Sequence, residues 1–245
     1  MKKIILALLA LIIVGLLSGA SFAATSAERI ITHSVSMIDE ITDQDDVSGM
    51  ADTVRGAHAV AIIPSMVKAG FILGGQYGEG LILVRDKGKW YGPSFYNIGG
   101  ASFGFQIGAQ SIALLLAVIN ENGVEAFVRS QTELGADVGI AAGPVGRRAE
   151  AATDAQVKAS IYSYSIAKGL FAGVSLQGAV ISVSVKRNTE YWGKTMPAYD
   201  ALQTPATDKR IQPLIRELEE LISKASDKPA DAKNTKNTKS SKKAK

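Results

Sequence analysis

The stretch KAGFILGGQYGEGLILVRDKGKWYGP, residues Lys68 to Pro93, decides the fold. Glycines recur in it between runs of apolar residues, at positions that include 70, 74, 75, 78, 80 and 88. Glycine in a strand typically marks a bulge, a bend or a close approach of two backbones. The tetrapeptide Asp86-Lys87-Gly88-Lys89 is typical of a hairpin turn, and the strand formers Trp90 and Tyr91 follow it. The stretch therefore predicts two glycine-kinked strands joined by a hairpin, at the start of an antiparallel sheet.

The same stretch resembles a known family. The segments KAGF (68–71), GGQYGEG (74–80) and WYGP (90–93) are similar to the SYLF family of lipid-binding domains, whose eukaryotic members are also described as actin-binding. Further matches are SFGFQIG (102–108), GPVG (143–146), YSYS (162–165), KGLFAG (168–173) and NTEY (188–191). The resemblance covers roughly residues 45 to 195. It implies a lipid-binding module.

Composition limits the classes of protein to consider. The chain has 245 residues, of which 47% are hydrophobic and 20% charged, so it can bury a sizeable core. It contains no cysteine, which excludes disulfides, thiolate metal sites and cysteine nucleophiles. The formal net charge of +4 comes from lysines near the two ends of the chain. No basic face of the kind that binds nucleic acid is indicated.

The chain divides into three parts. Residues 1–23 have lysines at 2 and 3, a long apolar run and the small-residue site Ser21-Phe22-Ala23, a pattern typical of a secretory signal peptide. Residues 24–225 are expected to form a single SYLF-like domain. Residues 226–245 are rich in lysine and lack large apolar residues, so we expect a disordered tail. The leader predicts an exported protein, periplasmic or secreted, either free or peripheral to an envelope membrane.

Periodicity predicts the elements around the hairpin. Apolar residues recur at helical spacing over 26–42, and we expect this amphipathic helix to pack on the sheet rather than lie on a membrane. Strands are expected over 57–63, 103–109, 112–119, 162–166 and 174–185, the last with a bulge near 180–181, and a closing helix over 214–222. Short helices are expected at 64–70 and 124–129. The predicted class is α+β: a strongly bent antiparallel sheet, barrel-like or sandwich-like, flanked by helices near both ends.

The residues needed for catalysis are sparse. A serine nucleophile needs a nearby base, usually histidine, and the chain has only His33 and His58 and no G-x-S-x-G elbow. The glycines of 70–88 fit neither dinucleotide nor P-loop patterns. Gly193-Lys194-Thr195 looks like the end of a P-loop, but Asn188 stands where its first glycine belongs. We therefore predict no enzymatic activity, no cofactor and no metal site.

Basic residues beside the glycine turns are the candidate ligand-binding residues. Glycine allows close approach of a head group and a nearby cation adds a charge-assisted contact. The predicted lipid-binding residues are Lys68, Phe71, Arg147, Arg148, Lys168 and Phe171. Three alternatives stay open: the two phenylalanines belong to the core, the two lysines merely cap strand ends, and the two arginines are simply solvated charges.

The functional hypothesis at this stage is an exported, non-enzymatic protein that contacts acidic phospholipid or envelope lipid. The alternative is a structural envelope protein whose lysine-rich tail binds anionic lipid or cell-wall polymer. The expected partner is a phospholipid or membrane surface, with no nucleic acid. Actin is an unexpected partner, because the compartment to which a leader directs the chain lacks it.

Removal of the leader is directly testable. We expect cleavage after Ala23, because the small-residue site follows an apolar run flanked by lysines. Intact-mass measurement of the protein from its native cells should give a chain that begins at Ala24. A chain that begins at Met1 would contradict the prediction.

Overall fold

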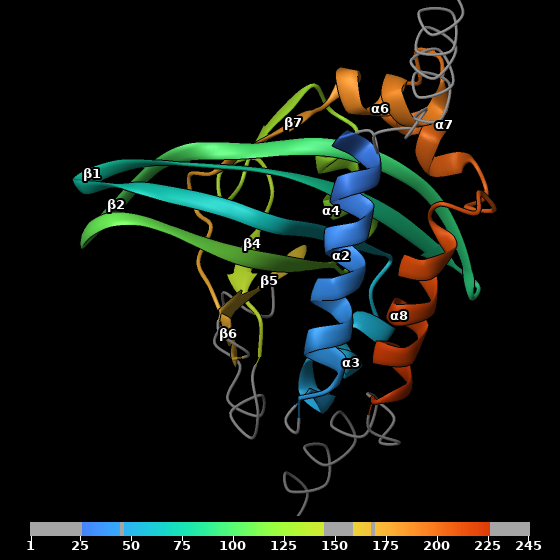
Figure 1. Ribbon diagram of the computed structural model, residues 1–245, viewed down its shortest axis with the longest axis horizontal. Helices are drawn as coiled ribbons and strands as arrows, with labels where there is room; N and C mark the ends of the chain where they lie inside the picture. The colour runs from blue at the N-terminus through green and yellow to red at the C-terminus, as the bar shows by residue number, and fades with distance from the viewer. Residues whose placement is uncertain (1–25, 45–46, 145–158, 168–169, 226–245) are drawn as a thin grey trace, which may run out of the picture.

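The computed structural model describes residues 26–44, 47–144, 159–167 and 170–225. The predicted leader and the predicted tail lie outside these ranges. Within them the chain forms an α+β fold, in which one strongly curled sheet carries helices near both ends (Figure 1). The predicted fold class is confirmed.

The predicted hairpin forms the centre of the sheet. Strands β1 (Ala59–Asp86) and β2 (Lys89–Val118) pair antiparallel along nearly their whole length. In the turn between them, Lys87 (φ 48°) and Gly88 (φ 76°) have left-handed backbone. A two-residue turn of this kind matches the twist of the flanking strands. Both strands therefore continue through the turn without splaying.

Strand β1 bends so that its two halves lie side by side. Its pairing with β2 shifts register between Ile63 and Met66 and between Gly70 and Ile72, and such bulges bend a strand. Figure 1 shows the two halves of β1 next to each other, with the halves of β2 outside them. A hydrogen bond of 2.8 Å from the Arg85 amide to the His58 carbonyl joins the two ends of β1. The hairpin alone thus supplies most of a half-barrel.

Glycine is required where the halves of β1 meet. A Cβ on Gly80 would lie closer to the Ile62 carbonyl oxygen than real Cβ atoms come, and 2.9 Å from the Tyr96 side chain. A Cβ on Gly78 would lie 2.7 Å from Ile63 Cγ2. Because the backbone oxygen of Ile62 cannot move aside without breaking the sheet, only a residue without a side chain fits at position 80.

Short strands extend the sheet along the edge of β2 that does not face β1. The first half of β2 pairs there with β7 (Val180–Val183), which in turn pairs with β3 (Gln131–Glu133). The end of β2 pairs with β5 (Ile161–Ala167), which also pairs with β4 (Ile140–Ala142) and β6 (Leu170–Gly173). The pairing of β4 with β5 is parallel, so the sheet is mixed rather than purely antiparallel as predicted.

Both faces of the sheet are buried. Alternate residues of β1, such as Val60 and Ile62, pack into a core under the helices, while Ala61 and Ile63 pack into a second core inside the curl. A strand that is covered on both faces reads as a continuous apolar run. This explains why residues 112–119 show no alternation, and the predicted core strand there is confirmed as the end of β2.

Helices α2 (Ser26–Thr42), α3 (Ser48–Arg55) and α8 (Gln212–Ser223) form one layer over the sheet. Helix α2 has the predicted bounds and packs against α8 and β1, as expected for a core helix.

Arg210 makes polar contacts in the segment just before α8. Its guanidinium donates to the Tyr191 carbonyl (2.9 Å) and pairs with Asp208 (2.7 Å). This hydrogen-bonded guanidinium lowers the pKa of Asp208. Of the helices in the described ranges, none is long and apolar enough to cross a membrane.

Helix α6 (Val185–Trp192) is pinned to β2 by a buried amide. The Asn188 side-chain oxygen accepts a hydrogen bond from the Phe95 amide (2.9 Å), and its nitrogen donates to Ser94 Oγ (3.4 Å). Gly193, with φ 66°, ends the helix in the left-handed conformation. The residues that resembled a P-loop are therefore a helix anchor and a helix terminator.

One predicted element is wrong, and two others have different bounds. Residues 64–70 continue β1 instead of forming a helix. Pro64 lies in a register shift between β1 and β2, where the strand pairing does not need the N–H that proline lacks. Helix α4 (Glu121–Ala126) begins three residues before the predicted Val124, since Asn120 caps it by accepting from the Gly123 amide (3.0 Å). Residues 174–179 are not strand; a turn at Gly178 precedes β7, in place of the predicted bulge.

Changing Gly80 to alanine tests the contact between the halves of β1. We expect Gly80→Ala to lower the free energy of unfolding by about 3 kcal/mol, because the new Cβ must displace backbone. Gly75→Ala is the matched control, since a Cβ there has nothing within 4 Å. Chemical denaturation of both variants gives the comparison. Equal stabilities would show that the halves of β1 are not in close contact.

Candidate functional site

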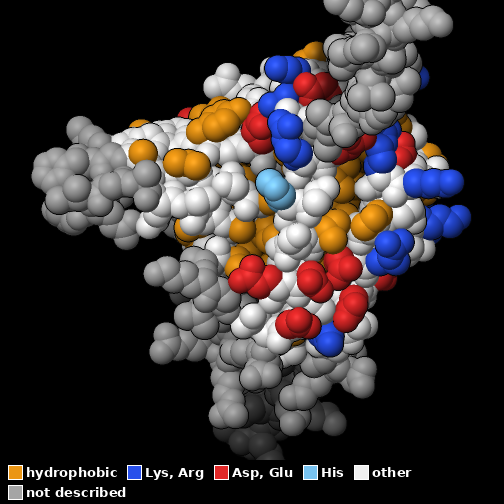
Figure 2. All heavy atoms as spheres, in the orientation of Figure 1, with side chains coloured by type: hydrophobic (Ala, Val, Ile, Leu, Met, Phe, Trp, Pro, Cys, Tyr) orange, Lys and Arg blue, Asp and Glu red, His pale blue; other side chains and the backbone are white. Residues whose placement is uncertain are grey.

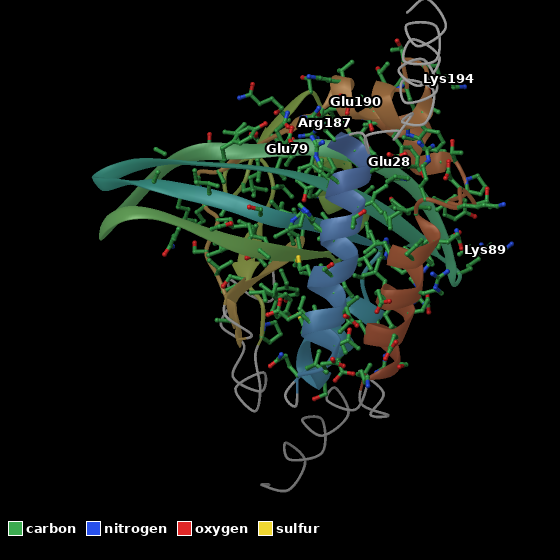
Figure 3. All side chains as sticks on the ribbon, viewed as in Figure 1. Glu28, Glu79, Lys89, Arg187, Glu190 and Lys194 are labelled. Carbon is green, nitrogen blue, oxygen red and sulfur yellow. The ribbon has the colours of Figure 1, made fainter. Side chains whose placement is uncertain are left out.

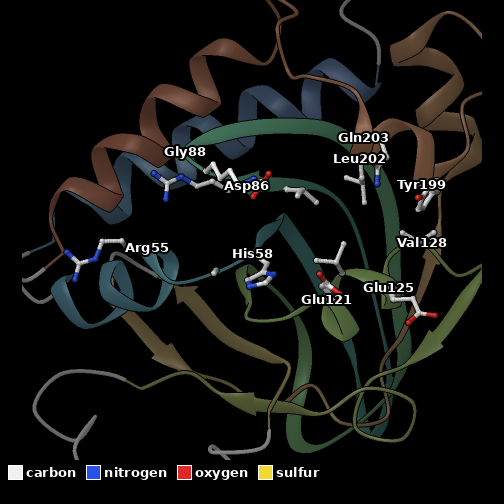
Figure 4. Close-up of a pocket in the computed structure, with 15 residues that line it drawn as sticks. Arg55, His58, Asp86, Gly88, Glu121, Glu125, Val128, Tyr199, Leu202 and Gln203 are labelled. Atoms are coloured by element: carbon white, nitrogen blue, oxygen red, sulfur yellow. The ribbon is translucent and has the colours of Figure 1, made fainter. Parts of the chain in front are cut away.

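A groove of about 830 Å³ opens at the end of the half-barrel where the hairpin turn lies (Figure 4). Four segments far apart in the sequence line it: the end of α3 with the start of β1, the hairpin turn, α4, and helix α7 (Ala198–Gln203). The lining residues are Arg55, Ala57, His58, Val84, Arg85, Asp86, Lys87, Gly88, Glu121, Val124, Glu125, Val128, Tyr199, Leu202 and Gln203.

Helix α4 forms one wall because it lies very close to the sheet. A Cβ on Gly123 would lie 2.6 Å from Val118 Cγ1 and 2.8 Å from the Ser160 carbonyl oxygen. The glycine therefore lets the first turn of the helix sit directly on β2. This position places Glu121 and Val124 at the groove.

The hairpin wall is fixed by a carboxylate from α8. Glu219 accepts a hydrogen bond of 2.7 Å from Trp90 Nε1 and pairs with Arg85, whose Nε lies 3.2 Å from Glu219 Oε1. The Arg85 guanidinium also lies 5.7 Å from the centre of the Trp90 ring, within range of a cation–π contact. One side chain thus joins the helix layer to the hairpin at the rim of the groove.

Helix α7 closes the third side. The Gly92 amide donates to the Thr204 carbonyl (2.9 Å), and the Ala206 amide donates to the Trp90 carbonyl (2.9 Å), so the chain after α7 runs along β2. Of the α7 residues at the groove, Leu202 is buried at 5% exposure, whereas Tyr199 is 59% exposed. An exposed tyrosine beside a buried leucine is a favourable arrangement for binding a partner side chain.

The groove combines an apolar floor with a charged rim. Val84, Val124 and Val128 are partly buried, and with Leu202 they provide apolar surface. Charged side chains surround them. Protein-binding surfaces commonly have an apolar centre and a polar rim. The arrangement is chemically suited to holding a peptide or protein segment.

A second, smaller pocket of about 280 Å³ lies between the N-terminal half of α2 and β1. Its lining includes Val67 and Tyr77, which are 47% and 55% exposed. Arg187 braces it: its Nη2 lies 2.9 Å from Glu79 Oε1 and its Nη1 3.0 Å from Glu190 Oε1 (Figure 3). Because Arg187 forms ion pairs with both Glu79 and Glu190, its charge is largely neutralised within the protein.

Carboxylates gather at one end of the helix layer, over α2 and α8 (Figure 2). Partial burial and the repulsion from Asp39, Glu220 and Asp43 raise the pKa of Glu217. Among the described residues there is no group of histidine, aspartate and glutamate side chains arranged to hold a metal ion.

Of the six predicted ligand-binding residues, only Lys68 is described with its side chain, and it does not line the groove. Lys68 lies in β1 opposite Gln110, and partial burial lowers the pKa of its ammonium group. Phe71 lies in β1 at the register shift, and Phe171 lies in β6 opposite Ile166; only the backbone of these two phenylalanines is described. Arg147, Arg148 and Lys168 lie outside the described residues. The roles assigned to the six residues stay predictions.

Sequence reasoning missed the residues that do form the groove. The helix predicted at 124–129 leaves Glu121 out, although Asn120 followed by Glu121 and Gly123 fits a capped helix start. Tyr199 and Leu202 lie in a six-residue helix too short to show a period. No local pattern signals that this helix lies across from α4.

Comparison with known families identifies the domain. The model of the family described as "Ysc84: Las17-binding protein actin regulator" matches residues 99–221, about half of the chain. The chain belongs to the Ysc84 family. This is the SYLF domain, so the resemblance seen in the sequence is confirmed.

The similar proteins of this family are eukaryotic. Human SH3 domain-containing YSC84-like protein 1 is 34% identical over 158 residues, which are 62% of this chain and 46% of the human protein. LAS seventeen-binding protein 3 of Saccharomyces cerevisiae is 36% identical over 177 residues, 69% of this chain and 38% of the yeast protein. SH3 domain-containing protein PJ696.02 of Schizosaccharomyces pombe is 44% identical over 124 residues, which are 49% of this chain and 29% of the S. pombe protein. The matched region thus spans less than half the length of these relatives.

These names overturn the functional hypothesis drawn from the sequence. The expectation of an exported protein that binds lipid, and that of a structural envelope protein, both find no support among relatives named for Las17 binding and actin regulation. The expectation that actin is an unlikely partner and phospholipid the partner is corrected for the same reason. The lipid ligand rests on the resemblance to the SYLF family, and actin is set aside because residues 1–23 look like a leader, although a leader bears only on location.

Removing the carboxylate of Glu219 tests how the groove is held. We expect Glu219→Ala to lower the free energy of unfolding by about 1 kcal/mol, because the Trp90 N–H and the Arg85 guanidinium lose their acceptor. Hydrogen exchange at residues 85–90 should become faster. Glu220→Ala is the matched control on the same helix. Unchanged exchange at the hairpin would show that this contact does not fix the groove wall.

Proposed function

We propose that this chain is a protein-binding module of the actin-regulating class, whose partner is a protein of the Las17 type. The groove between the hairpin turn, α4 and α7 is the proposed docking site. Family membership supports the partner class, and the apolar floor with its charged rim supports the site.

The proposed role is non-enzymatic. The chain has two histidines and no cysteine. His58 lies at the groove and His33 at the smaller pocket, so they do not form a joint site. A groove with exposed Tyr199 at its rim is better suited to burying a partner side chain than to positioning reacting groups.

The location of the chain in the cell stays a separate proposal. If residues 1–23 are removed as expected, the domain works outside the compartment in which it is made, and its Las17-type partner must be sought there. The N-terminal residue of the protein from its native cells therefore decides which compartment to search.

Binding to recombinant Las17 tests the function. The full-length chain should bind it in a calorimetric titration, with LAS seventeen-binding protein 3 as the positive control. Tyr199→Ala should weaken binding about tenfold, a typical loss for an exposed aromatic anchor. Tyr77→Ala removes an equally exposed tyrosine from the smaller pocket and should leave binding unchanged.

Two outcomes would overturn the proposal. The first is no binding at concentrations where the yeast protein binds. The second is binding that Tyr77→Ala weakens and Tyr199→Ala does not. Sedimentation with actin filaments is measured in parallel. Association with actin but not with Las17 would also contradict the proposed partner class.

A further inference from the structure

We infer that the groove takes a basic, apolar segment, in which large aliphatic side chains lie next to lysines or arginines. This inference rests on the proposed protein-binding function and names the chemistry of the partner segment. The charges of the groove and the character of its floor carry the inference.

The floor requires large aliphatic side chains in the partner. Val84, Val124, Val128 and Leu202 contribute apolar side chains to the groove, and Tyr199, which is 59% exposed, lines the same groove. Covering such surface is favourable by about 25 cal/mol for each Å² removed from water. A segment made only of polar residues would leave this surface uncovered.

The rim requires basic residues in the partner. Three of the charges at the groove are in ion pairs within the protein: Arg55 with Asp52, Arg85 with Glu219 and Glu125 with Arg129. The rim charges that make no ion pair with another described residue are Asp86, Lys87 and Glu121. Two carboxylates against one ammonium give the rim an acidic excess.

The two carboxylates lie on different walls. Asp86 belongs to the hairpin turn, and Glu121 belongs to the first turn of α4 (Figure 4). A segment lying in the groove therefore passes between two acidic side chains with the apolar floor beneath it. Lysines or arginines on both sides of an aliphatic centre match this pattern.

The chain's own lysine-rich end is the competing occupant. Helix α8, which precedes residues 226–245 in the sequence, packs on α3, whose last residue Arg55 lines the groove. Those residues supply lysines but no large apolar side chain. They match the rim and not the floor, and for this reason an external partner is the occupant that we propose.

Synthetic peptides test the inference independently of Las17. The probe is the fluorescein-labelled peptide KLLKKLLK, titrated with the full-length protein and followed by anisotropy. Two analogues serve as matched ligands: ELLEELLE reverses the charges, and KAAKKAAK removes the aliphatic groups. We expect the first probe to bind at least tenfold more tightly than either analogue.

Three variants locate the binding. Tyr199→Ala should weaken binding of the probe about tenfold. Glu121→Lys should weaken it about fivefold and reduce its dependence on salt, because one attractive charge becomes repulsive. Tyr77→Ala should stay within twofold of the parent, since Tyr77 lies at the other pocket.

Three outcomes would overturn the inference. If ELLEELLE binds as tightly as the probe, the charge of the peptide does not matter. If KAAKKAAK binds as tightly, only the charged rim contributes to binding, as we would expect for residues 226–245. Binding that Tyr199→Ala leaves intact shows that the peptide lies elsewhere. If the probe binds as expected while Las17 does not, the inference stands and the proposed partner class fails.

Discussion

The contact between the two halves of β1 is the constraint on which the rest of the structure depends. Gly80 brings its backbone against the Ile62 carbonyl, and the Arg85 amide bonds to the His58 carbonyl at the end of the same seam. When the two halves of β1 are in contact, the two halves of β2 lie outside them. The first half of β2 then pairs with β7, and the second half pairs with β5. The sheet therefore curls because one strand is folded, and not because many strands are arranged around an axis.

A few hydrogen bonds, each with at least one buried partner, fix the positions of the helices on this curled sheet. Asn188 joins α6 to the Phe95 amide, and Glu219 joins α8 to the Trp90 indole. A buried donor that loses its acceptor costs about 1–3 kcal/mol, more than a typical exposed ion pair contributes. The helices are held by such single contacts at the edges of large apolar interfaces, which is why their placement cannot be read from their own amphipathic patterns.

How far the sequence predicts this structure depends on how local each signal is. The hairpin turn at Lys87-Gly88, helix α2 and strand β5 follow from turn chemistry and periodicity, and the structure confirms them. The helix expected at 64–70 fails because strand pairing with β2 overrides the preference of Pro64 for a helix start. The groove could not be predicted from the sequence for a related reason. Its walls come from four segments spread between residues 55 and 203, and Tyr199 faces α4 only because the sheet closes.

Because the groove forms from four separate segments, it exists only when the seam of β1 is closed. His58 and Arg85, the two residues joined at the end of that seam, both line it. A partner that binds there binds the folded state and not the unfolded chain, so it stabilises the fold by linkage. At a free concentration of a hundred times its Kd, a ligand of this kind adds about 2.7 kcal/mol to the free energy of unfolding. That amount is comparable to what the glycine at position 80 is expected to contribute. The partner and the seam thus act on the same equilibrium, so a bound partner should offset much of the stability that a weakened seam loses.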